Sequence, residues 1–599
     1  MHFFQSLCTQ RLFLGESLTM NTDKNSASFM RSLCLGYIEE DIILPYPEMK
    51  PQEKELLSGV IDTLGATYKG RDAEYRAWDR AGEFPAGVVD EMKQLGLFGL
   101  IIPEEFGGLG MSSTAYSRTL QELAKYDASV ALTVGVHSSI GMRALTLFGT
   151  PEQKAKYLPK LASGEMLASF CLTEPGAGSD AASLKAKAVR DGDHWILNGQ
   201  KIWITNGGIS DFFTVFARTD GAEGQITAFI VTRDMGGVSH GPHEDKMGIR
   251  ANNTVTMTFD NVRIPKDHVL GEVGKGFKVA MSVLNAGRTG LGGGCIGAMK
   301  NLIELSTKQS KERMQFGKPI SDYGLIKQKI GHMVVECYAS ESLVGMVAGI
   351  IDQGYKDFAV EAAISKVFAT ECLWRTADEA LQIAGGNGFM CEFPYERILR
   401  NSRINRIFEG TNDILRLFIA LTAMNDTGKQ LKELSKSLEG IFNDPIKGFG
   451  ILSEYAIRRV SQTTGIATTK GEFTKLSANL QPFAEIFEDG TRDLAAAADR
   501  ILRKHGKNII GKQFATKRLA DIMIDLFALA SVLSRVDASI KKNGPQKAYN
   551  ELEILQVFAG QVRRRTKSNF GKIDNNDDEL IKSLADHALQ NEKFIWDNV

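Results

Sequence analysis

Between residues 171 and 265 the chain changes from helical patterns to strand patterns, and helical patterns return on the other side. Three strand-like runs, rich in β-branched and aromatic residues, lie between turn residues at 212–218, 225–232 and 254–264. In the last run Val255, Met257 and Phe259 alternate with threonines, as in a strand with one buried face. The pattern predicts a compact β-domain between two helical regions.

The flanking regions predict a mainly α protein with a central β-domain and a further helical domain at the C-terminus. Leu519–Leu533 is nearly continuously apolar but contains Asp521 and Asp525, which indicates a buried helix and not a membrane span. The expected division is an N-terminal extension at 1–49, an N-terminal helical domain at 50–170, the β-domain at 171–274, a second helical domain at 275–425, a linker at 426–470 and a C-terminal helical domain at 471–599.

The charges of the chain nearly cancel. A net charge of −1 and 43% hydrophobic residues describe a soluble globular protein with an ample core and give no sign of nucleic-acid binding. The cysteines lack metal-ligand spacing, so we expect thiols in a reducing compartment, with no disulfide framework and no zinc site. They are Cys8, Cys34, Cys171, Cys295, Cys337, Cys372 and Cys391.

The first twenty residues lack an apolar signal core and carry only Arg11 as a clear positive charge, which argues against a secretory signal. Two interpretations stay open: a poor mitochondrial presequence, or an overlong start with Met20 as the initiator. We expect a bacterial cytoplasmic protein, or a mitochondrial one if the source is eukaryotic.

Phe408–Asp413 places a carboxylate, Glu409, on a bend before a predicted helix. Gly410 permits the turn, Thr411 can cap the helix, and Asp413 complements the exposed N–H groups of the first turn. Such a position suits a catalytic base, although most glutamates in this setting are solvated or capping.

The loop Leu172–Asp180 has two glycines that let the backbone approach a ligand, while Thr173 and Ser179 offer hydroxyls. For an isolated segment, an ordinary Pro-Gly turn is the more common explanation.

β-formers flank Asn198-Gly199, a strong hairpin signal, so two paired strands are expected there. In the second strand Trp203 and Thr205 would share one face, because side chains alternate. That face suits an aromatic heterocycle with polar edge atoms; a half-buried sheet face with one Trp is an equal alternative.

Two glycine clusters have different interpretations. Gln382–Phe389 follows a helical stretch and combines close backbone approach with a Gln amide, although a helix C-cap would look similar. Gly292, Gly294 and Gly297 form a G-x-G-x-x-G, but no strand precedes them, so we exclude a dinucleotide fingerprint.

Taken together and in this order, these segments resemble the acyl-CoA dehydrogenase family of flavoenzymes, and Arg313 within Lys311–Gly317 adds a further match. The resemblance covers roughly residues 80 to 425 and implies the α–β–α fold described above. The additional segment beyond residue 425 resembles the very-long-chain branch.

The resemblance implies bound FAD and acyl-CoA. Near FAD it places Phe170, Cys171, Thr173, Gly178, Ser179, Trp203, Ile204, Thr205, Arg313, Phe316, Gln382, Gly385, Gly386, Thr411, Asn412 and Asp413. Arg313 with Gln382–Gly386 would grip the FAD pyrophosphate of a neighbouring subunit, and a guanidinium matches phosphate oxygens bidentately. Near the substrate it places Ser179, Arg288, Phe408 and Gly410.

The implied reaction is α,β-dehydrogenation of a fatty acyl-CoA, with Glu409 as the base and an electron-transferring flavoprotein as the acceptor. Burial beside Phe408 should raise the pKa of this carboxyl toward that of the proton it receives. Other branches place the base before an Arg on an earlier helix, but Asn285–Arg288 contains no carboxylate here. Arg288 itself would contact the CoA portion or serve as a structural Arg.

The floor of the acyl pocket is expected at His137–Met142, where Gly141 and other small residues stand and Met142 replaces the Gln of medium-chain relatives. A deeper slot for long acyl chains follows from this expectation.

By resemblance to the long-chain branch we expect a homodimer. The segment 438–460 mixes apolar and basic residues, and would be either an amphipathic membrane-surface element or a linker.

Two other functions stay open. An acyl-CoA oxidase would use the same base and flavin, but such relatives usually depart from the Thr173–Asp180 pattern, and the peroxisomal ones often end in Ser-Lys-Leu, whereas this chain ends in Asp-Asn-Val. A respiratory-complex assembly role could use the C-terminal region.

Overall fold

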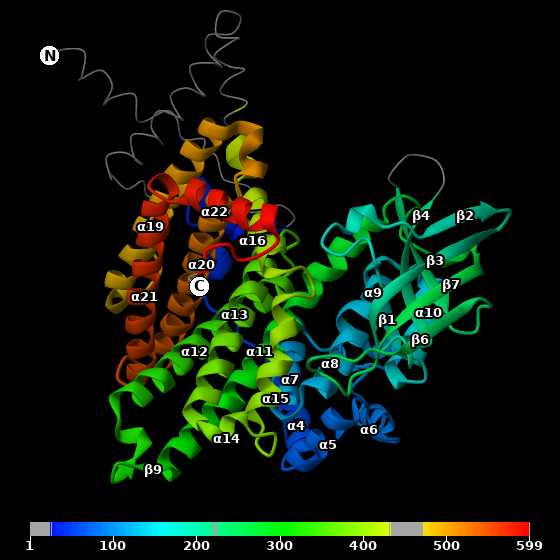
Figure 1. The fold of residues 1–599 in the computed structure, drawn as a ribbon, viewed down its shortest axis with the longest axis horizontal. Helices are drawn as coiled ribbons and strands as arrows, with labels where there is room; N and C mark the ends of the chain where they lie inside the picture. The colour runs from blue at the N-terminus through cyan, green and yellow to red at the C-terminus, as the bar shows by residue number, and fades with distance from the viewer. Residues whose placement is uncertain (1–23, 25–26, 220–224, 430–431, 433–470, 598–599) are drawn as a thin grey trace, which may run out of the picture.

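The computed structural model describes residues 24, 27–219, 225–429, 432 and 471–597. Helices form an elongated body, a β-sheet lies at one side of it, and the C-terminal helices lie at the other (Figure 1). The predicted fold class, mainly α with a central β-domain and a C-terminal helical region, is confirmed.

The helices before the sheet are α2 (Phe29–Cys34), α3 (Glu40–Ile43), α4 (Pro51–Tyr68), α5 (Asp72–Ala81), α6 (Val88–Gln94), α7 (Ser113–Tyr126), α8 (Ala128–Val136), α9 (Arg143–Phe148) and α10 (Pro151–Ser163). A π-helical turn, His137–Gly141, joins α8 to α9. Helix α10 begins with a capping box, in which Thr150 and Gln153 each accept a hydrogen bond from the backbone N–H of the other.

The main sheet has eight strands in the order β6-β7-β3-β2-β4-β5-β8, and β1, which lies off this path, pairs with the first half of β4. They are β1 (Ala168–Cys171), β2 (Lys187–Asp191), β3 (His194–Thr205), β4 (Phe212–Thr219), β5 (Ile226–Thr232), β6 (Val238–His243), β7 (Thr254–Pro265) and β8 (Val269–Leu270). β4 pairs in parallel with β1 and β2, and the other pairs are antiparallel. Val255, Met257 and Phe259 are buried, as their alternation predicts.

The hairpin predicted at Asn198-Gly199 is wrong. β3 continues straight through these residues, and the real hairpin turns at Gly192-Asp193 between β2 and β3, with a left-handed φ of 58° at Gly192. Gly199 is required for a different reason: a Cβ there would lie 2.5 Å from the Cβ of Ala186. The glycine therefore permits close strand packing at a β-bulge and does not make a turn.

Helices return after the sheet, interrupted by a small ribbon of β9 (Met314–Gln315) and β10 (Lys318–Pro319). The longer helices are α11 (Gly276–Glu312), α12 (Gly324–Asp352), α13 (Ala359–Ala384), α15 (Tyr395–Arg403) and α16 (Asn412–Ala423), and α14 (Gly386–Phe389) is a single turn. The C-terminal region adds α19 (Gln481–His505), α20 (Gln513–Asn543), α21 (Tyr549–Asp574) and α22 (Asp578–Asn591).

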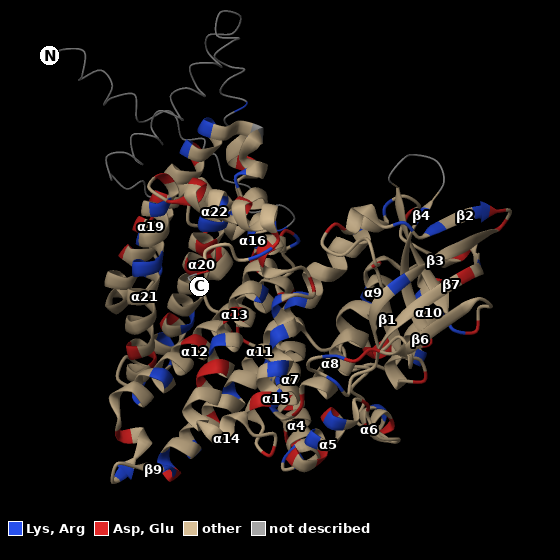
Figure 2. Ribbon diagram, viewed as in Figure 1, with Lys and Arg blue, Asp and Glu red and all other residues tan. Residues whose placement is uncertain are grey.

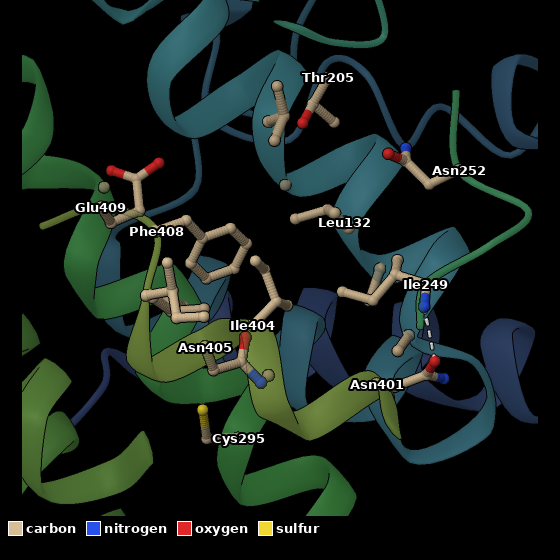
Figure 3. A pocket seen from close by; sticks show the side chains of 18 of the residues that line it. Leu132, Thr205, Ile249, Asn252, Cys295, Asn401, Ile404, Asn405, Phe408 and Glu409 are labelled. Carbon is tan, nitrogen blue, oxygen red and sulfur yellow. Dashed lines mark hydrogen bonds between the residues drawn. The ribbon is translucent and has the colours of Figure 1, made fainter. Parts of the chain in front are cut away.

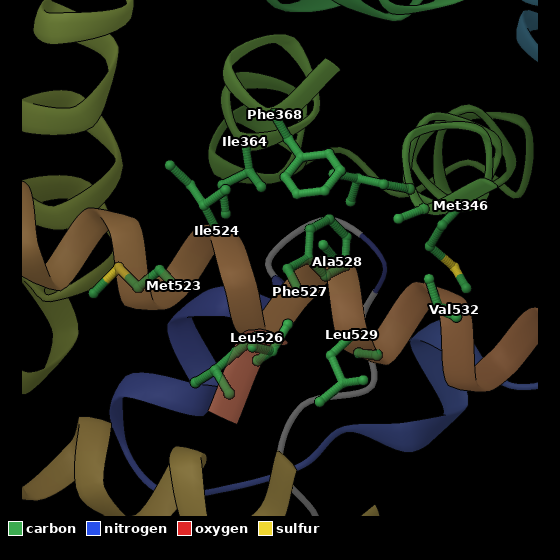
Figure 4. Close-up of a cluster of buried hydrophobic side chains, with 14 of the residues drawn as sticks. Met346, Ile364, Phe368, Met523, Ile524, Leu526, Phe527, Ala528, Leu529 and Val532 are labelled. Carbon is green, nitrogen blue, oxygen red and sulfur yellow. The ribbon is translucent and has the colours of Figure 1, made fainter. Parts of the chain in front are cut away.

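Helix α20 is the buried helix that the sequence predicts at Leu519–Leu533. Phe527 and Ala528 lie against Ile364 and Phe368 of α13, and Met346 of α12 lies beside them (Figure 4). The two aspartates that interrupt the apolar run are both paired with arginines: Asp525 with Arg565 at 2.7 Å, and Asp521 with Arg416 at 2.7 Å. The C-terminal helices therefore share one core with the second helical region.

Residues 28–44 extend this shared core from the other end of the chain. Phe29 of α2 is fully buried, and the centre of its ring lies 5.7 Å from that of Phe527 and 6.2 Å from that of Phe487. The N-terminal segment thus covers the C-terminal helices.

The glycines of the discarded G-x-G-x-x-G lie inside α11 and bring neighbouring helices close. A Cβ at Gly292 would lie 2.7 Å from Val344 of α12, and one at Gly293 would lie 2.4 Å from the Ser117 carbonyl oxygen of α7. A Cβ at Gly297 would lie 1.9 Å from the Gln121 carbonyl oxygen, which leaves no room for it.

Lysines and arginines alternate with acidic residues over both the helical body and the sheet (Figure 2). Among the described residues, Ala128–Phe148 and Gly324–Asp352 are apolar and long enough to span a membrane by length and composition alone. Their apolar windows are 72% and 67% buried inside the protein, as expected of core helices. All of the predicted linker except residues 426–429 and 432 lies outside the described residues, and so do the segment 438–460, both candidate start sites and Cys8; the six described cysteines are free.

The contact between α7 and α11 yields a stability prediction. Gly297→Ala should lower the free energy of unfolding by about 1–3 kcal/mol, because the added methyl group overlaps the Gln121 carbonyl. Gly294→Ala is the matched control, since a Cβ there meets only Ala124 at 3.7 Å. Thermal unfolding of the full chain tests this, and equal melting temperatures for the two variants would contradict the packing account.

Candidate active site

A cavity of about 920 Å³ lies where the sheet meets α7, α8, α11 and α15. It gathers residues that stand far apart in the sequence but were predicted to act together: Phe170, Thr173, Gly178, Ser179, Trp203, Ile204, Thr205, Arg288, Phe408, Glu409, Gly410 and Thr411. Figure 3 shows Phe408 and Glu409 on one wall and Leu132 and Thr205 on the facing side. The volume is within the usual range for ligand sites.

Other predicted residues lie outside this cavity. Arg313, Phe316, Gln382, Gly385 and Gly386 are exposed at the far ends of α11 and α13, and Phe316 is 93% exposed. The Cys171 side chain is buried in the core of the sheet. The Asn412 side chain bonds to α13, and Asp413 is exposed on α16.

The cavity wall formed by β3 keeps the predicted alternation of Trp203 and Thr205 against Ile204 despite an irregularity in the strand. A β-bulge lies between Lys201 and Ile204, and Trp203 has a left-handed φ of 57°. Trp203 and Thr205 line the cavity, while the Ile204 side chain is buried in the core of the sheet, as the alternation predicts, although Ile204 also contributes to the cavity wall. Trp203 is 64% exposed, and its indole beside the Thr205 hydroxyl fits a flat aromatic group with polar edges.

A buried ion pair holds the two predicted loops together. Lys201 Nζ of β3 lies 2.7 Å from Glu174 Oε1 and donates to the Leu172 carbonyl at 3.1 Å. Glu174 also accepts hydrogen bonds from the backbone N–H groups of Lys185 and Ala186. The Glu and Lys of these motifs therefore position the loop that carries Thr173 and Ser179, without facing the cavity themselves.

Glu409 is held in an unusual backbone conformation. Its φ is 57° and that of Gly410 is 90°, so two consecutive residues are left-handed before α16 begins. Thr411 caps the helix as predicted, accepting a hydrogen bond from Ile414 N at 3.2 Å. Left-handed non-glycine residues are costly and cluster at functional sites; Trp203 and Ile249 are two others on this cavity.

The Glu409 carboxyl is buried, and Oε2 has no hydrogen-bond partner among the described residues. Burial raises the pKa of Glu409 above its ordinary value of 4.5, while the positive charges of Arg288 and then Lys366 oppose this shift. Arg288 is also buried, which lowers the pKa of its guanidinium to about 10. The centre of the Phe418 ring lies 6.0 Å from this guanidinium.

Lys366 of α13 is a residue that motif analysis missed. It is fully buried, and Nζ donates to the Gly410 carbonyl at 2.8 Å and to Asn412 Oδ1 at 2.9 Å. Burial lowers the pKa of Lys366 to about 7, although the Glu409 charge opposes that shift. A single lysine in the apolar stretch Ala359–Ala369 was the available signal for it.

Further polar contacts fix the start of α16. Asn412 Nδ2 donates to Glu371 Oε1 at 3.0 Å, and Glu371 pairs with Arg406 at 3.0 Å and Arg416 at 3.4 Å. Arg416 pairs in turn with Asp521 of α20. The bend that carries Glu409 is thus connected to the C-terminal helices through paired side chains.

The predicted floor at Gly141 and Met142 is wrong. A Cβ at Gly141 would lie 2.7 Å from the Ala168 carbonyl oxygen, so this glycine permits packing against β1, and Met142 is fully buried in the core. Of the predicted floor segment, Ser139 and Ile140 line the cavity. The cavity continues past them between α7, α8 and α11, so its depth does not come from Gly141 and Met142.

Four family profiles match the chain. They are described as acyl-CoA dehydrogenase N-terminal domain at 66–165, middle domain at 169–262 and C-terminal domain at 274–424, and ACAD9/ACADV C-terminal domain at 478–594.

Individual relatives extend over most of the chain. The mitochondrial very long-chain specific acyl-CoA dehydrogenase of Homo sapiens is 42% identical over 566 residues, which cover 92% of this chain and 85% of that protein. A probable acyl-CoA dehydrogenase of Bacillus subtilis is 37% identical and covers 80% of each. The crystal structure of an acyl-CoA dehydrogenase complexed with FAD from Bacillus anthracis has a TM-score of 0.78 and 31% identity, covering 93% of this chain and 94% of that one.

Proposed function

Because the chain belongs to the acyl-CoA dehydrogenase family, we propose that Glu409 is the base that removes the α-proton of a bound fatty acyl-CoA. The protein is an FAD-dependent dehydrogenase that converts fatty acyl-CoA to trans-2-enoyl-CoA in fatty acid β-oxidation. The observation that carries our assignment is the buried Glu409 carboxyl, which faces the cavity without a hydrogen-bond partner among the described residues.

A base for this step needs two properties that compete. Burial raises its pKa, which brings the carboxylate closer to the weakly acidic proton that it must accept. The carboxylate must nevertheless be ionised before the reaction, and the positive charges of Arg288 and Lys366 favour the ionised form. We therefore propose that Arg288 acts on the charge of Glu409; its contact with the CoA portion stays a prediction.

The developing charge on the thioester carbonyl also needs a hydrogen-bond donor. The backbone N–H of Glu409 makes no hydrogen bond to the described residues and is therefore available to donate to that oxygen. Phe408, Gly410 and Ser179 line the same part of the cavity, which supports their assignment to the substrate site.

The residues on the β3 side of the cavity fit FAD. The exposed indole of Trp203 and the hydroxyls of Thr173, Ser179 and Thr205 provide a flat apolar surface with polar groups around it. When bound, FAD accepts the β-hydrogen of the substrate as hydride. We propose that these residues, with Phe170, Gly178, Ile204 and Thr411, hold its ring system, and that Cys171, Asn412 and Asp413 contact it through backbone or neighbouring atoms.

We further propose a homodimer. Arg313, Phe316, Gln382, Gly385 and Gly386 are exposed and lie outside the cavity, a placement that suits contact with the FAD of a second subunit. Phe316 has a left-handed φ of 52° and is 93% exposed, so its ring is free to pack against a partner. An electron-transferring flavoprotein is the proposed acceptor.

The relatives indicate the cellular location of this protein only in part, since they include mitochondrial and bacterial proteins. We propose the bacterial cytoplasm, or the mitochondrion if the source is eukaryotic. Peripheral membrane contact through the segment 438–460 stays part of the proposal.

The depth of the cavity supports a preference for long acyl chains. Lining residues recur along one face of α11 from Arg288 to Asn301, a distance of about 20 Å at 1.5 Å per residue. One of them, Gly294, leaves space, since a Cβ there would meet only Ala124 of α7 at 3.7 Å, so the cavity continues between α7 and α11.

The preference leads to a substrate series as a test. The kcat/KM of palmitoyl-CoA should exceed that of octanoyl-CoA by about tenfold or more, since each buried methylene contributes about 0.8 kcal/mol. A higher kcat/KM for butyryl- or octanoyl-CoA would refute the long-chain proposal.

Glu409→Gln should lower kcat by about 10²- to 10⁴-fold, because the amide keeps the size of the side chain but cannot accept the α-proton. The flavin content should stay unchanged. Glu361→Gln is the control: it alters a fully buried carboxyl that bonds to Ser28 outside the cavity. Retained turnover in Glu409→Gln would remove Glu409 from the role of base.

Lys366→Met should move the acid limb of the kcat/KM profile to higher pH. A nearby cation favours the ionised carboxylate, so its loss raises the pKa of Glu409 further, and activity falls most at low pH. Lys329→Gln is the control, since it breaks the ion pair between Lys329 of α12 and Glu379 of α13, the helix that carries Lys366, and neither residue lines the cavity. An acid limb that coincides with that of the wild type would show that Lys366 does not act on the base.

A further inference from the structure

The end of the cavity remote from Glu409 has a different chemical character from its middle. The middle is apolar, lined by Ala124 and Ala128 on one side and by Leu291 and Ala298 of α11 on the other. One turn beyond Ala298, the next lining residue on α11 is Asn301. An acyl chain that starts at Glu409 would therefore pass through hydrocarbon surroundings and then meet polar groups.

Three helices converge at that remote end. Lys125 at the end of α7 pairs with Glu304 of α11 at 3.3 Å, and Tyr395 Oη of α15 donates to the Leu305 carbonyl of α11 at 3.3 Å. These contacts bring the residue that follows α7, Asp127, and the first turn of α15 to the level of Asn301. We call the group Asp127, Asn301 and Arg397 the distal polar end; all three line the cavity.

The distal polar end has unused hydrogen-bonding capacity. Asp127 caps α8 through Oδ1, which accepts from Ser129 N at 2.8 Å and Val130 N at 3.0 Å, while Oδ2 has no donor among the described residues. Across the same described ranges, neither the Asn301 amide nor the Arg397 guanidinium makes a hydrogen bond or an ion pair.

Arg397 is only 6% exposed, and its guanidinium lies 5.8 Å from the centre of the Tyr75 ring. Its charge opposes the rise that burial causes in the pKa of Asp127, so the two groups are near each other, yet no ion pair joins them. None of the free polar atoms of Asp127, Asn301 and Arg397 is among the fully buried, unpartnered atoms of the described residues, so water can reach them in the free protein and a polar ligand group can take the place of that water.

We propose that the distal polar end is a subsite for the terminal hydroxyl of an ω-hydroxylated long-chain acyl-CoA. A hydroxyl both donates and accepts, so it can donate to Asp127 Oδ2 and accept from Arg397 or from the Asn301 amide. A terminal carboxylate can only accept, and it would lie beside the Asp127 carboxylate. This proposal rests on the long-chain dehydrogenase function proposed above and adds a substrate class to it.

Chain length provides the sharpest test, because only a chain of the right length brings its hydroxyl to the distal polar end. The FAD-loaded full chain is assayed with palmitoyl-CoA and 16-hydroxypalmitoyl-CoA, and with lauroyl-CoA and 12-hydroxylauroyl-CoA. The measured quantity is the ratio of kcat/KM for the hydroxylated substrate to that of its parent. The ratio should be near one for the longer pair and about tenfold lower for the shorter pair, whose hydroxyl is left without partners between Leu291 and Ala298.

Two variants separate the subsite from general effects of chain polarity. Arg397→Met and Asn301→Leu should each lower the ratio for the longer pair by about tenfold while leaving the ratio for the shorter pair where it was. Arg397→Lys, which retains a hydrogen-bond donor, should restore much of the kcat/KM ratio for the longer pair.

Equal ratios at the two lengths in the wild type would overturn the proposal, as would an unchanged longer ratio in both Arg397→Met and Asn301→Leu. If Arg397→Met does not fold, the wild-type length comparison and Asn301→Leu decide the matter. A failure to oxidise palmitoyl-CoA itself would instead contradict the proposed function, so the two failures are distinguishable.

Discussion

The site depends on keeping a carboxylate buried without a hydrogen-bond partner of its own. Glu409 is placed in an apolar cavity by a left-handed backbone, and its ionised form is favoured by two buried cations that do not hydrogen-bond to it. Direct pairing with Arg288 or Lys366 would satisfy the carboxylate but make it a poor base. The arrangement instead supplies charge from a distance and leaves the Oε2 atom free for a proton.

The surrounding fold can be understood as the means of holding that arrangement. Lys366 fixes the bend through the Gly410 carbonyl, and Asn412, Glu371 and Arg416 connect the following helix to α13 and α20. On the other side of the cavity, the buried Lys201–Glu174 pair positions the loop opposite the base. Each support is an ion pair or a charge-assisted hydrogen bond with little exposure to water, where such interactions are strong.

Much of the fold and of the cavity could be predicted from the sequence. Strand alternation at Val255–Phe259 and the caps around Thr411 are local patterns, and the structure confirms both. The motif residues from Phe170 to Thr411 were assigned to one site through the family resemblance and not through any local pattern, and they line one cavity. The prediction of a hairpin at Asn198-Gly199 failed because Gly199 is required by its close approach to Ala186, a cross-strand contact that no local pattern reveals. The prediction that Gly141 lies at the floor of the acyl pocket failed for the same reason, since Gly141 packs against β1, which is distant in the sequence. The positions of Lys366 and of the distal polar end depend on which helices pack together. The spacing of residues along one helix does not predict that packing.

The central claim is that Glu409 stands against carbon 2 of the bound acyl chain. A crystal structure of the FAD-loaded protein with a non-reactive long-chain acyl-CoA analogue tests it most directly. We expect a Glu409 carboxylate oxygen within about 3.5 Å of that carbon, the separation of a near-attack arrangement. A carboxylate turned away to pair with Arg288 or Lys366, with carbon 2 beyond its reach, would contradict the account.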